Sequence, residues 1–244
     1  MVGEILKKLE AYSDQEFKFD PIKHKYTYQG DHFISVTQFI SRFHKEFDTE
    51  FWSKKKAEDR GVDQTEVLRE WKELNDRANE IGTATHNWIE NYFNRLYQEL
   101  PADLDIIDRI NKFNIAYAKH LHKLTPVKFE QRIFSKKWKI AGMIDSLFLF
   151  KDSVVIFDWK TNKKFNTDAD RIFEYLLEPF GKLGKNHFNE YSIQVSLYRL
   201  ILREIGIDVK NCYLLHIGPN SDAKLYKALD LTQELEEYLS SNTL

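Results

Sequence analysis

The chain has 244 residues, of which 42% are hydrophobic and 14% aromatic, enough apolar side chain for the core of one domain or at most two. Nine glycines and five prolines are too few for a disordered or collagen-like chain. The net charge of −2 excludes a protein that is polycationic overall. No apolar run approaches the roughly 20 residues that cross a bilayer, and the N-terminus lacks a signal-peptide layout, so we expect a soluble intracellular protein.

A single cysteine, Cys212, restricts the metal chemistry that the chain can support. It excludes an intrachain disulfide and any zinc or iron–sulfur site that needs several thiolates from one chain. A metal would therefore be held by carboxylate, imidazole, carbonyl or water ligands, which favour a hard ion such as Mg²⁺ or Mn²⁺. No Walker A motif occurs, so the chain is not an ATP-driven helicase–nuclease by itself.

The N-terminal part begins with strand-like residues and continues in helices. Residues 17–40 predict short strands around the turn Gln29-Gly30-Asp31, followed by a helix that Ser35 and Gln38 open with capping-box spacing. Asp63 has a weaker form of the same start signal. The further helices predicted here cover residues 48–60, 63–100 and 104–124.

The second half predicts a sheet. Three strand-like segments with short polar connections predict an antiparallel meander, and they cover residues 127–134, 139–149 and 153–159. Beyond a mixed segment we expect a helix at 190–205, strands at 209–217 and 223–229, and a helix at 231–240. The order helix, three strands, helix, strand predicts an α/β core behind a mainly helical N-terminal part. We expect residues 1–81 to form that N-terminal part and 82–244 the core, as one compact unit.

Strand register brings charged residues of the meander together. With Lys151-Asp152 as a two-residue turn, Asp145 faces Asp158 with Cβ atoms roughly 4.5–5.5 Å apart. Lys160 shares the face of Asp158. A tight turn near Lys136-Lys137 would place Glu130 opposite Met143, diagonal to Asp145.

Facing carboxylates repel each other unless a cation lies between them. The three carboxylates and the lysine therefore predict a divalent-metal site that polarises a phosphate and activates a water molecule. The alternative for Asp158 and Lys160 alone is an ordinary ion pair at the end of a strand.

Two short motifs in this region resemble a known superfamily. The sequence "GMID" at 142–145, then "DWKT" at 158–161, both preceded by Glu130, resembles the core of the PD-(D/E)XK nucleases. Upstream, "GTATHNWIE" supplies Gly82, His86 and Glu90, and downstream "QVSLY" supplies Gln194 and Tyr198, as in the RecB-like exonuclease branch. The resemblance covers about residues 82–217, and it implies a restriction-endonuclease-like αβββαβ core with a mixed sheet.

The resemblance also implies a role for each residue. The metal ligands would be His86, Asp145, Asp158, the carbonyl of Trp159 and Glu130, with Mg²⁺ or Mn²⁺ as the ion. Lys160 would position or activate the attacking water, and Gln194 would orient that lysine or the scissile phosphate. Glu90 would accept a hydrogen bond from His86 and so support this ligand without contacting the metal. The expected DNA-binding residues are Tyr198, Lys54, Lys55, Lys56 and Lys163, although lysine clusters are more often simply solvated.

The expected function is that of a metal-dependent DNA exonuclease in repair, recombination or replication, acting on single strands or ends. The layout, without an iron–sulfur cluster, is similar to lambda-exonuclease-like phage nucleases and to mitochondrial genome maintenance exonucleases. The helical arch of the mitochondrial type would correspond to residues 48–80. A recombinase or single-strand-binding protein is a candidate partner besides DNA. The expected location is the cytoplasm of a bacterial or phage-infected cell, or an organellar matrix if the N-terminus is trimmed. The alternatives are a structure-specific endonuclease and a catalytically silent module that binds DNA or a partner.

Overall fold

One mixed sheet runs through the whole molecule. The computed structural model describes residues 1–20, 23, 25–219 and 221–242. Within them, eight strands form the sheet in the order β1-β2-β3-β5-β6-β7-β8, and β4 pairs with β5 beside this path. The strands are β1 Phe17–Asp20, β2 Lys25–Tyr28, β3 Asp31–Ser35, β4 Thr125–Ser135, β5 Ile140–Phe150, β6 Ser153–Lys160, β7 Val209–His216 and β8 Lys224–Lys227.

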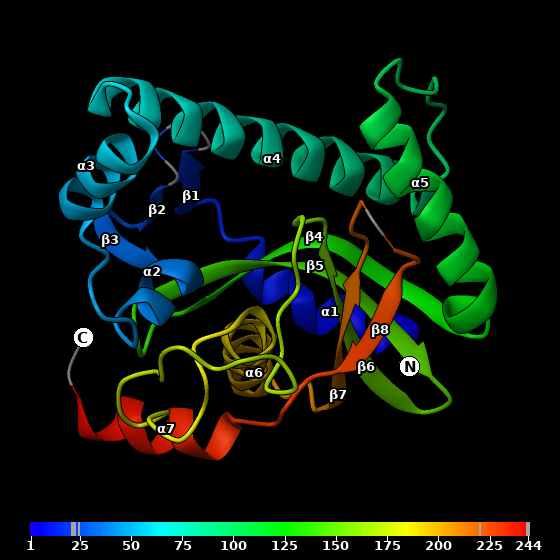
Figure 1. Ribbon diagram of the computed structural model, residues 1–244. Coiled ribbons are helices and arrows are strands. Elements are labelled where there is room, and N and C mark those ends of the chain that lie inside the picture. The colour runs from blue at the N-terminus through cyan, green and yellow to red at the C-terminus, as the bar shows by residue number, and fades with distance from the viewer. Residues whose placement is uncertain (21–22, 24, 220, 243–244) are drawn as a thin grey trace.

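Helices cover both faces of this sheet (Figure 1). The long helix α4 crosses one side with α3 and α5 at its two ends, whereas α6 and α7 lie on the other side. The α-helices are α1 Val2–Leu9, α2 Val36–Ser41, α3 Thr49–Arg60, α4 Gln64–Phe93, α5 Leu104–Ala116, α6 His187–Glu204 and α7 Thr232–Ser241. The predicted order of helix, three strands, helix and strand is confirmed in α4, β4, β5, β6, α6 and β7, with α5 inserted before β4.

Strand β6 is apolar because it is buried on both faces. Val154 and Ile156 belong to the hydrophobic cluster that contains α1, α2, α6 and α7. Val155, Phe157 and Trp159 belong to the second cluster, which packs against α4 and α5. A strand covered on both faces reads as a continuous hydrophobic run, so the charges of Asp158 and Lys160 stand at the end of a fully buried element.

Several predicted boundaries are confirmed by local hydrogen bonds. Ser35 caps α2 through a complete capping box with Gln38, and the carboxylate of Asp63 caps α4. The helix predicted over 63–100 ends at Phe93, and Arg95 then adopts a φ of +56°, which a right-handed helix cannot contain. The helix predicted over 104–124 is α5 followed by a π-helical turn at Tyr117–Leu121. No element is predicted for residues 2–9, where α1 lies.

The meander has one predicted connection right and one wrong. Phe150 pairs with Ser153 across the two-residue turn, and this register continues to Ser146 and Phe157. The first connection is longer than predicted, because Ser135 pairs with Ile140 and leaves four residues, 136–139, outside the ladder. Trp138 in this connection is buried, and its backbone N–H donates to Ser135 Oγ. The longer loop shifts β4 by two residues against β5.

The predicted division at residues 81 and 82 falls inside the single helix α4. The N-terminal strands also join the core sheet, because β3 pairs in parallel with the start of β5. None of the helices within the described residues is long and apolar enough to cross a membrane.

Candidate active site

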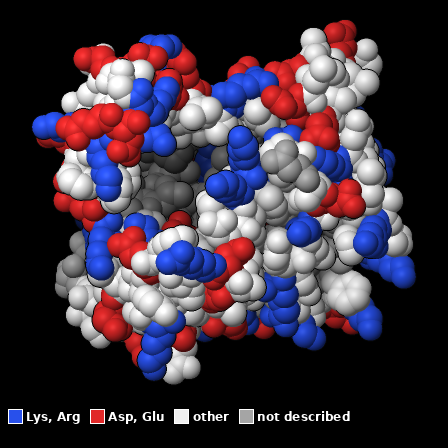
Figure 2. Space-filling model, viewed as in Figure 1, with Lys and Arg blue, Asp and Glu red and all other residues white. Residues whose placement is uncertain are grey.

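A cavity of about 400 Å³ lies where α4 crosses the carboxyl end of β6. Its walls include the middle of α4 around His86, Glu130 of β4, the end of β6 at Lys160, and Tyr191 of α6. Gly82 lets α4 come this close, since a Cβ atom there would lie only 3.3 Å from Thr161 Oγ1. On the face of the molecule seen in Figure 2, Lys and Arg side chains (blue) are interspersed with Asp and Glu side chains (red).

Three potential metal ligands lie together at this cavity, and two of them, His86 and Glu130, line it. His86, Glu130 and Asp145 each offer one ligand atom, and these atoms all lie within 4.8 Å of one another. His86 Nδ1 is 3.6 Å from Glu130 Oε1 and 3.6 Å from Asp145 Oδ1. Ligand atoms of a hexacoordinate Mg²⁺ ion lie between about 3 Å (adjacent) and about 4.2 Å (opposite) apart, and both of these distances fall in that range.

The register of β4 explains how Glu130 joins the group. Phe129 pairs with Ser146 and Gln131 with Ile144, so Glu130 lies level with Asp145. The predicted position opposite Met143 is wrong, because the longer loop at 136–139 gives that partner to Arg132. Glu130 itself adopts a φ of +45°, a left-handed conformation that costs a non-glycine residue about 1–3 kcal/mol. Such local strain is a feature of functional sites.

The carboxylates determine the protonation of the histidine. Burial disfavours the charged imidazole, but Asp145 and Glu130 outweigh it and raise the pKa of His86 to about 9. Burial likewise raises the pKa of Asp145. Burial and the neighbouring Asp145 also raise the pKa of Asp158 to about 6, although Lys160 opposes the shift. The cluster thus holds an excess of buried negative charge that a proton or a metal cation can neutralise.

The orientation of the imidazole favours Nδ1 as the ligating nitrogen. His86 Nε2 lies 3.0 Å from the carbonyl oxygen of Trp159. A ligating histidine commonly donates its other N–H to such a carbonyl, which fixes the ring. Trp159 therefore orients His86 in this arrangement, in contrast to its predicted role as a direct ligand. Both ring nitrogens face other groups, so the predicted support from Glu90 is not found.

Asp158 and Lys160 form the second half of the site. Lys160 Nζ lies 2.7 Å from Asp158 Oδ2 and donates to Gln194 Oε1 at 3.0 Å. Asp158 Oδ1 is buried and has no hydrogen-bond partner among the described residues. A buried carboxylate oxygen without a partner is costly, and a cation would satisfy it. Carboxylate oxygens of this kind are ligands of hard divalent ions, whereas the ligand atoms that lie within 4.8 Å of one another in the described part of the chain are those of His86, Glu130 and Asp145.

The two aspartates stand one position beyond the last pair of the ladder, Ser146 and Phe157, whose register is the predicted one. Asp145 Oδ2 accepts the backbone N–H of Trp159 at 2.7 Å. Asp145 consequently lies with His86, while Asp158 lies with Lys160.

Tyr198 has a different position from the one expected of a DNA-binding residue. Its side chain is buried in the core, with 4% of the residue exposed. Its hydroxyl accepts a hydrogen bond from Gln194 Nε2 at 2.8 Å. A Cβ atom at Gly142 would lie 2.7 Å from its ring. The predicted contact with DNA is therefore wrong for this residue, which instead anchors Gln194.

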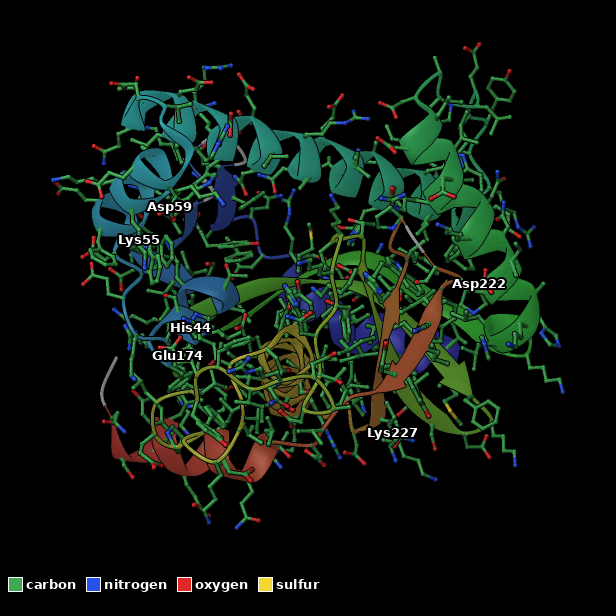
Figure 3. All side chains as sticks on the ribbon, in the orientation of Figure 1. His44, Lys55, Asp59, Glu174, Asp222 and Lys227 are labelled. Atoms are coloured by element: carbon green, nitrogen blue, oxygen red, sulfur yellow. The ribbon has the colours of Figure 1, made fainter. Side chains whose placement is uncertain are left out.

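The predicted lysines lie outside the cavity that contains the carboxylates. Lys54, Lys55 and Lys56 are exposed on α3, and Lys55 lies over the ring of Trp52 (Figure 3). Residues 48–80 hold seven Lys and Arg against ten Asp and Glu, a net charge of −3. This helical hairpin is therefore acidic overall, and DNA binding by its lysines stays a prediction. Lys163 is exposed just beyond β6.

Tyr191 is a site residue that the sequence motifs missed. Lys160 Nζ lies 4.0 Å from the centre of its ring, a cation–π contact that holds the ammonium group from a third direction. Tyr191 precedes Gln194 by one helical turn on α6, so both side chains face β6. This three-residue spacing on the predicted helix is the sequence feature that could have identified Tyr191.

Comparison with known proteins adds little to this description. No family model matches the chain, and no curated protein matches it. Among solved structures, the chain overlaps SSO0001 with a TM-score of 0.29 at 12% identity, covering 68% of this chain and 70% of that one. It overlaps a protein of Eubacterium rectale, provisionally described as an exonuclease, with a TM-score of 0.38 at 13% identity, covering 86% and 78%. Overlaps this loose support no argument about function, which has to come from the site's own residues.

Proposed function

We propose that this protein is a divalent-metal-dependent deoxyribonuclease of the PD-(D/E)XK type, acting as an exonuclease. The observation that carries the proposal is one cavity that brings together two groups of side chains. One group offers nitrogen and oxygen ligands from His86, Glu130 and Asp145. The other fixes the ammonium group of Lys160 between Asp158 and Gln194. Hydrolysis of a phosphodiester needs both a cation at the phosphate and a positioned water molecule.

The residues of the chain would divide the work as follows. His86, Glu130, Asp145 and the free oxygen of Asp158 would hold Mg²⁺ or Mn²⁺, which supplies charge stabilisation and a more acidic water. Lys160 would hold the attacking water or stabilise the charge that develops on the phosphate. Asp158 and Gln194 keep its ammonium group in place, and Tyr198 keeps Gln194 in place.

The dimensions of the cavity support a single-stranded or ended substrate. A volume of about 400 Å³ lies at the lower end of the range for small-molecule sites. It suits one nucleotide of a strand better than a base-paired segment, and residues of α4 between Ala78 and Asn87 line it. DNA is thus the proposed partner, and repair, recombination or replication is the proposed context.

A cleavage assay with three DNA substrates tests the proposal. Purified protein with Mg²⁺ or Mn²⁺ is incubated with end-labelled linear, end-blocked linear and closed circular single strands. We expect release of short products from the linear strand, resistance of the circle, and complete inhibition by EDTA. Cleavage of the circle would instead identify an endonuclease.

Two site variants complete the test. Asp145→Asn and Lys160→Ala should each abolish cleavage, whereas Lys151→Ala, an exposed lysine on the β5–β6 turn, should not change it. Full activity in either site variant would refute the assignment. A wild-type protein that binds strands without cleaving them under any of these metal conditions would be a silent DNA-binding module.

A further inference from the structure

A second cavity adjoins the catalytic one. It has a volume of about 390 Å³ and lies between α4, α5 and the loops that follow β6 and β7. Ala78, Thr161 and Asn162 line both cavities, so the two are neighbours on either side of the same residues. A strand whose scissile phosphate lies at Lys160 would therefore have its adjacent nucleotide beside this second cavity.

A buried arginine points into the second cavity with part of its guanidinium unused. Arg109 of α5 is only 4% exposed. Its Nη1 donates to Asp108 Oδ2 at 2.7 Å and to the carbonyl oxygen of Asp105 at 3.4 Å. Nε is buried and has no hydrogen-bond partner within the described ranges, and Nη2 takes no part in the two bonds of Nη1. Buried donors without partners are costly, and a guanidinium is well suited to phosphate oxygens.

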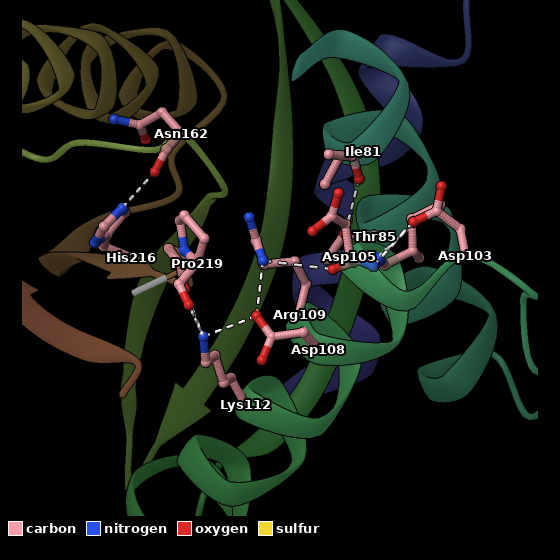
Figure 4. A network of polar contacts seen from close by, with 12 residues as sticks. Ile81, Thr85, Asp103, Asp105, Asp108, Arg109, Lys112, Asn162, His216 and Pro219 are labelled. Carbon is pink, nitrogen blue, oxygen red and sulfur yellow. Dashed lines mark hydrogen bonds and ion pairs between the residues drawn. The ribbon is translucent and has the colours of Figure 1, made fainter. Parts of the chain in front are cut away.

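The surroundings hold this arginine firmly. Lys112, one turn along α5, donates to Asp108 Oδ2 and to the carbonyl oxygens of Gly218 and Pro219 (Figure 4). These bonds fix the loop after β7 against α5. In Figure 4 the guanidinium of Arg109 lies between Pro219 and the carbonyl of Asp105. The arrangement is thus preorganised and does not depend on a flexible surface cation.

The rest of the wall combines positive charge with apolar surface. Arg77, Arg109, Lys163 and Asp105 line the cavity. Arg77 is paired with Glu80, Asp103 and Asp105, and Arg109 is paired with Asp108. Lys163 is exposed and forms no ion pair or hydrogen bond with any described residue. Leu74, Ile81 and Pro219 supply the apolar part, and Leu74 is 69% exposed at the surface.

We infer that this second cavity is a nucleotide subsite, which binds the nucleotide next to the scissile phosphodiester of a single strand. The inference rests on the proposed nuclease function and adds to it. Arg109 and Lys163 bind the phosphate, while Leu74, Ile81 and Pro219 take the sugar or base. Apolar and cationic groups side by side are the combination that sequence-tolerant binding of single strands requires.

Strand binding tests the subsite separately from cleavage. A short fluorescein-labelled oligodeoxynucleotide is titrated with the Lys160→Ala protein, and anisotropy is followed at several salt concentrations. Lys163→Ala in this background should weaken binding roughly tenfold, which is the contribution of one charge-assisted hydrogen bond to a phosphate. It should also reduce the slope of log affinity against log salt by about 0.7, the value for one phosphate contact in a single strand. Leu74→Glu should weaken binding at least as much, because it places a carboxylate at the cavity mouth.

Matched surface variants serve as controls. Lys119→Ala removes an exposed lysine elsewhere, and Leu104→Glu changes a leucine that is 79% exposed and lies outside the cavity. Both should bind as the parent does. Arg109→Lys keeps a positive charge beside Asp108 but loses the free Nε, and it should weaken binding with an unchanged unfolding midpoint.

The outcomes separate the two proposals. If the wild-type protein cleaves DNA but Lys163→Ala and Leu74→Glu bind like the controls, the subsite is refuted and the nuclease stands. If no cleavage occurs but these variants lose affinity and salt dependence, the second cavity binds a single strand and the nuclease function is refuted.

Discussion

Substitution of Gly142 by alanine probes how the core holds Lys160. The new Cβ atom would lie 2.7 Å from Tyr198 Cε1 and 3.0 Å from Val36 Cγ2. Carbon atoms prefer separations of about 3.5–4.0 Å, so the tyrosine ring must move by about 1 Å. Inserting a methyl group into a packed core in this way costs about 1–3 kcal/mol. We therefore expect the unfolding midpoint to fall by about 2–4 °C for each kcal/mol lost.

The same displacement should reach the active site. Tyr198 anchors Gln194, and Gln194 accepts from Lys160 at 3.0 Å. A misplacement of about 1 Å at a catalytic group can reduce the rate on the order of 100-fold. Gly142→Ala should accordingly lower the single-turnover rate of cleavage much more than it weakens binding of the strand.

Urea unfolding and single-turnover cleavage measure the two effects. Gly3→Ala is the matched control, because a Cβ atom there meets nothing within 4 Å, and it should change neither quantity adversely. In the double variant Gly142→Ala with Tyr198→Leu, the smaller side chain should recover part of the lost stability but not the rate. Wild-type stability and rate in Gly142→Ala would refute the packing argument and the coupling of Tyr198 to Lys160.

Three further predictions follow from single side chains. A metal ion binds the neutral imidazole, and the pKa of His86 is raised to about 9. Metal affinity, measured by calorimetry, should therefore rise up to tenfold per pH unit between about pH 6.5 and 9 and then level off. A metal affinity that does not change with pH would contradict His86 as a ligand. Without metal, in EDTA, the raised pKa of His86 stabilises the folded chain below about pH 6.5, and this contribution is lost as the pH rises through about 9. Tyr191→Leu should reduce kcat about 5- to 30-fold with an unchanged KM. Tyr191→Phe keeps the aromatic ring beside Lys160 and should have the kcat of the wild type. Equal rates in the two variants would rule out a role for the cation–π contact. Burial raises the pKa of the Cys212 thiol to about 12, so a thiol reagent should label the folded protein at pH 8 only at the rate of unfolding.

The sequence by itself determined those features that depend on neighbours along the chain. The capping box of Ser35 and Gln38 and the two-residue turn at Lys151-Asp152 involve only residues within a few positions of each other. The order of helix, three strands, helix and strand follows from hydrophobic periodicity in the same local way. The order of the charged motifs along these elements likewise predicts which carboxylates and which lysine act together, and their action in one site stays a prediction.

Only the tertiary structure decided which contacts these residues make with one another. The length of the 136–139 loop set the partner of Glu130, because burying Trp138 requires a longer connection than a tight turn. Tyr198 faces the core because Gly142, 56 positions earlier, leaves room for its ring. The second cavity likewise arises where α4 and α5 meet the loops after β6 and β7. Such contacts depend on packing between distant segments, and no local pattern in the chain encodes them.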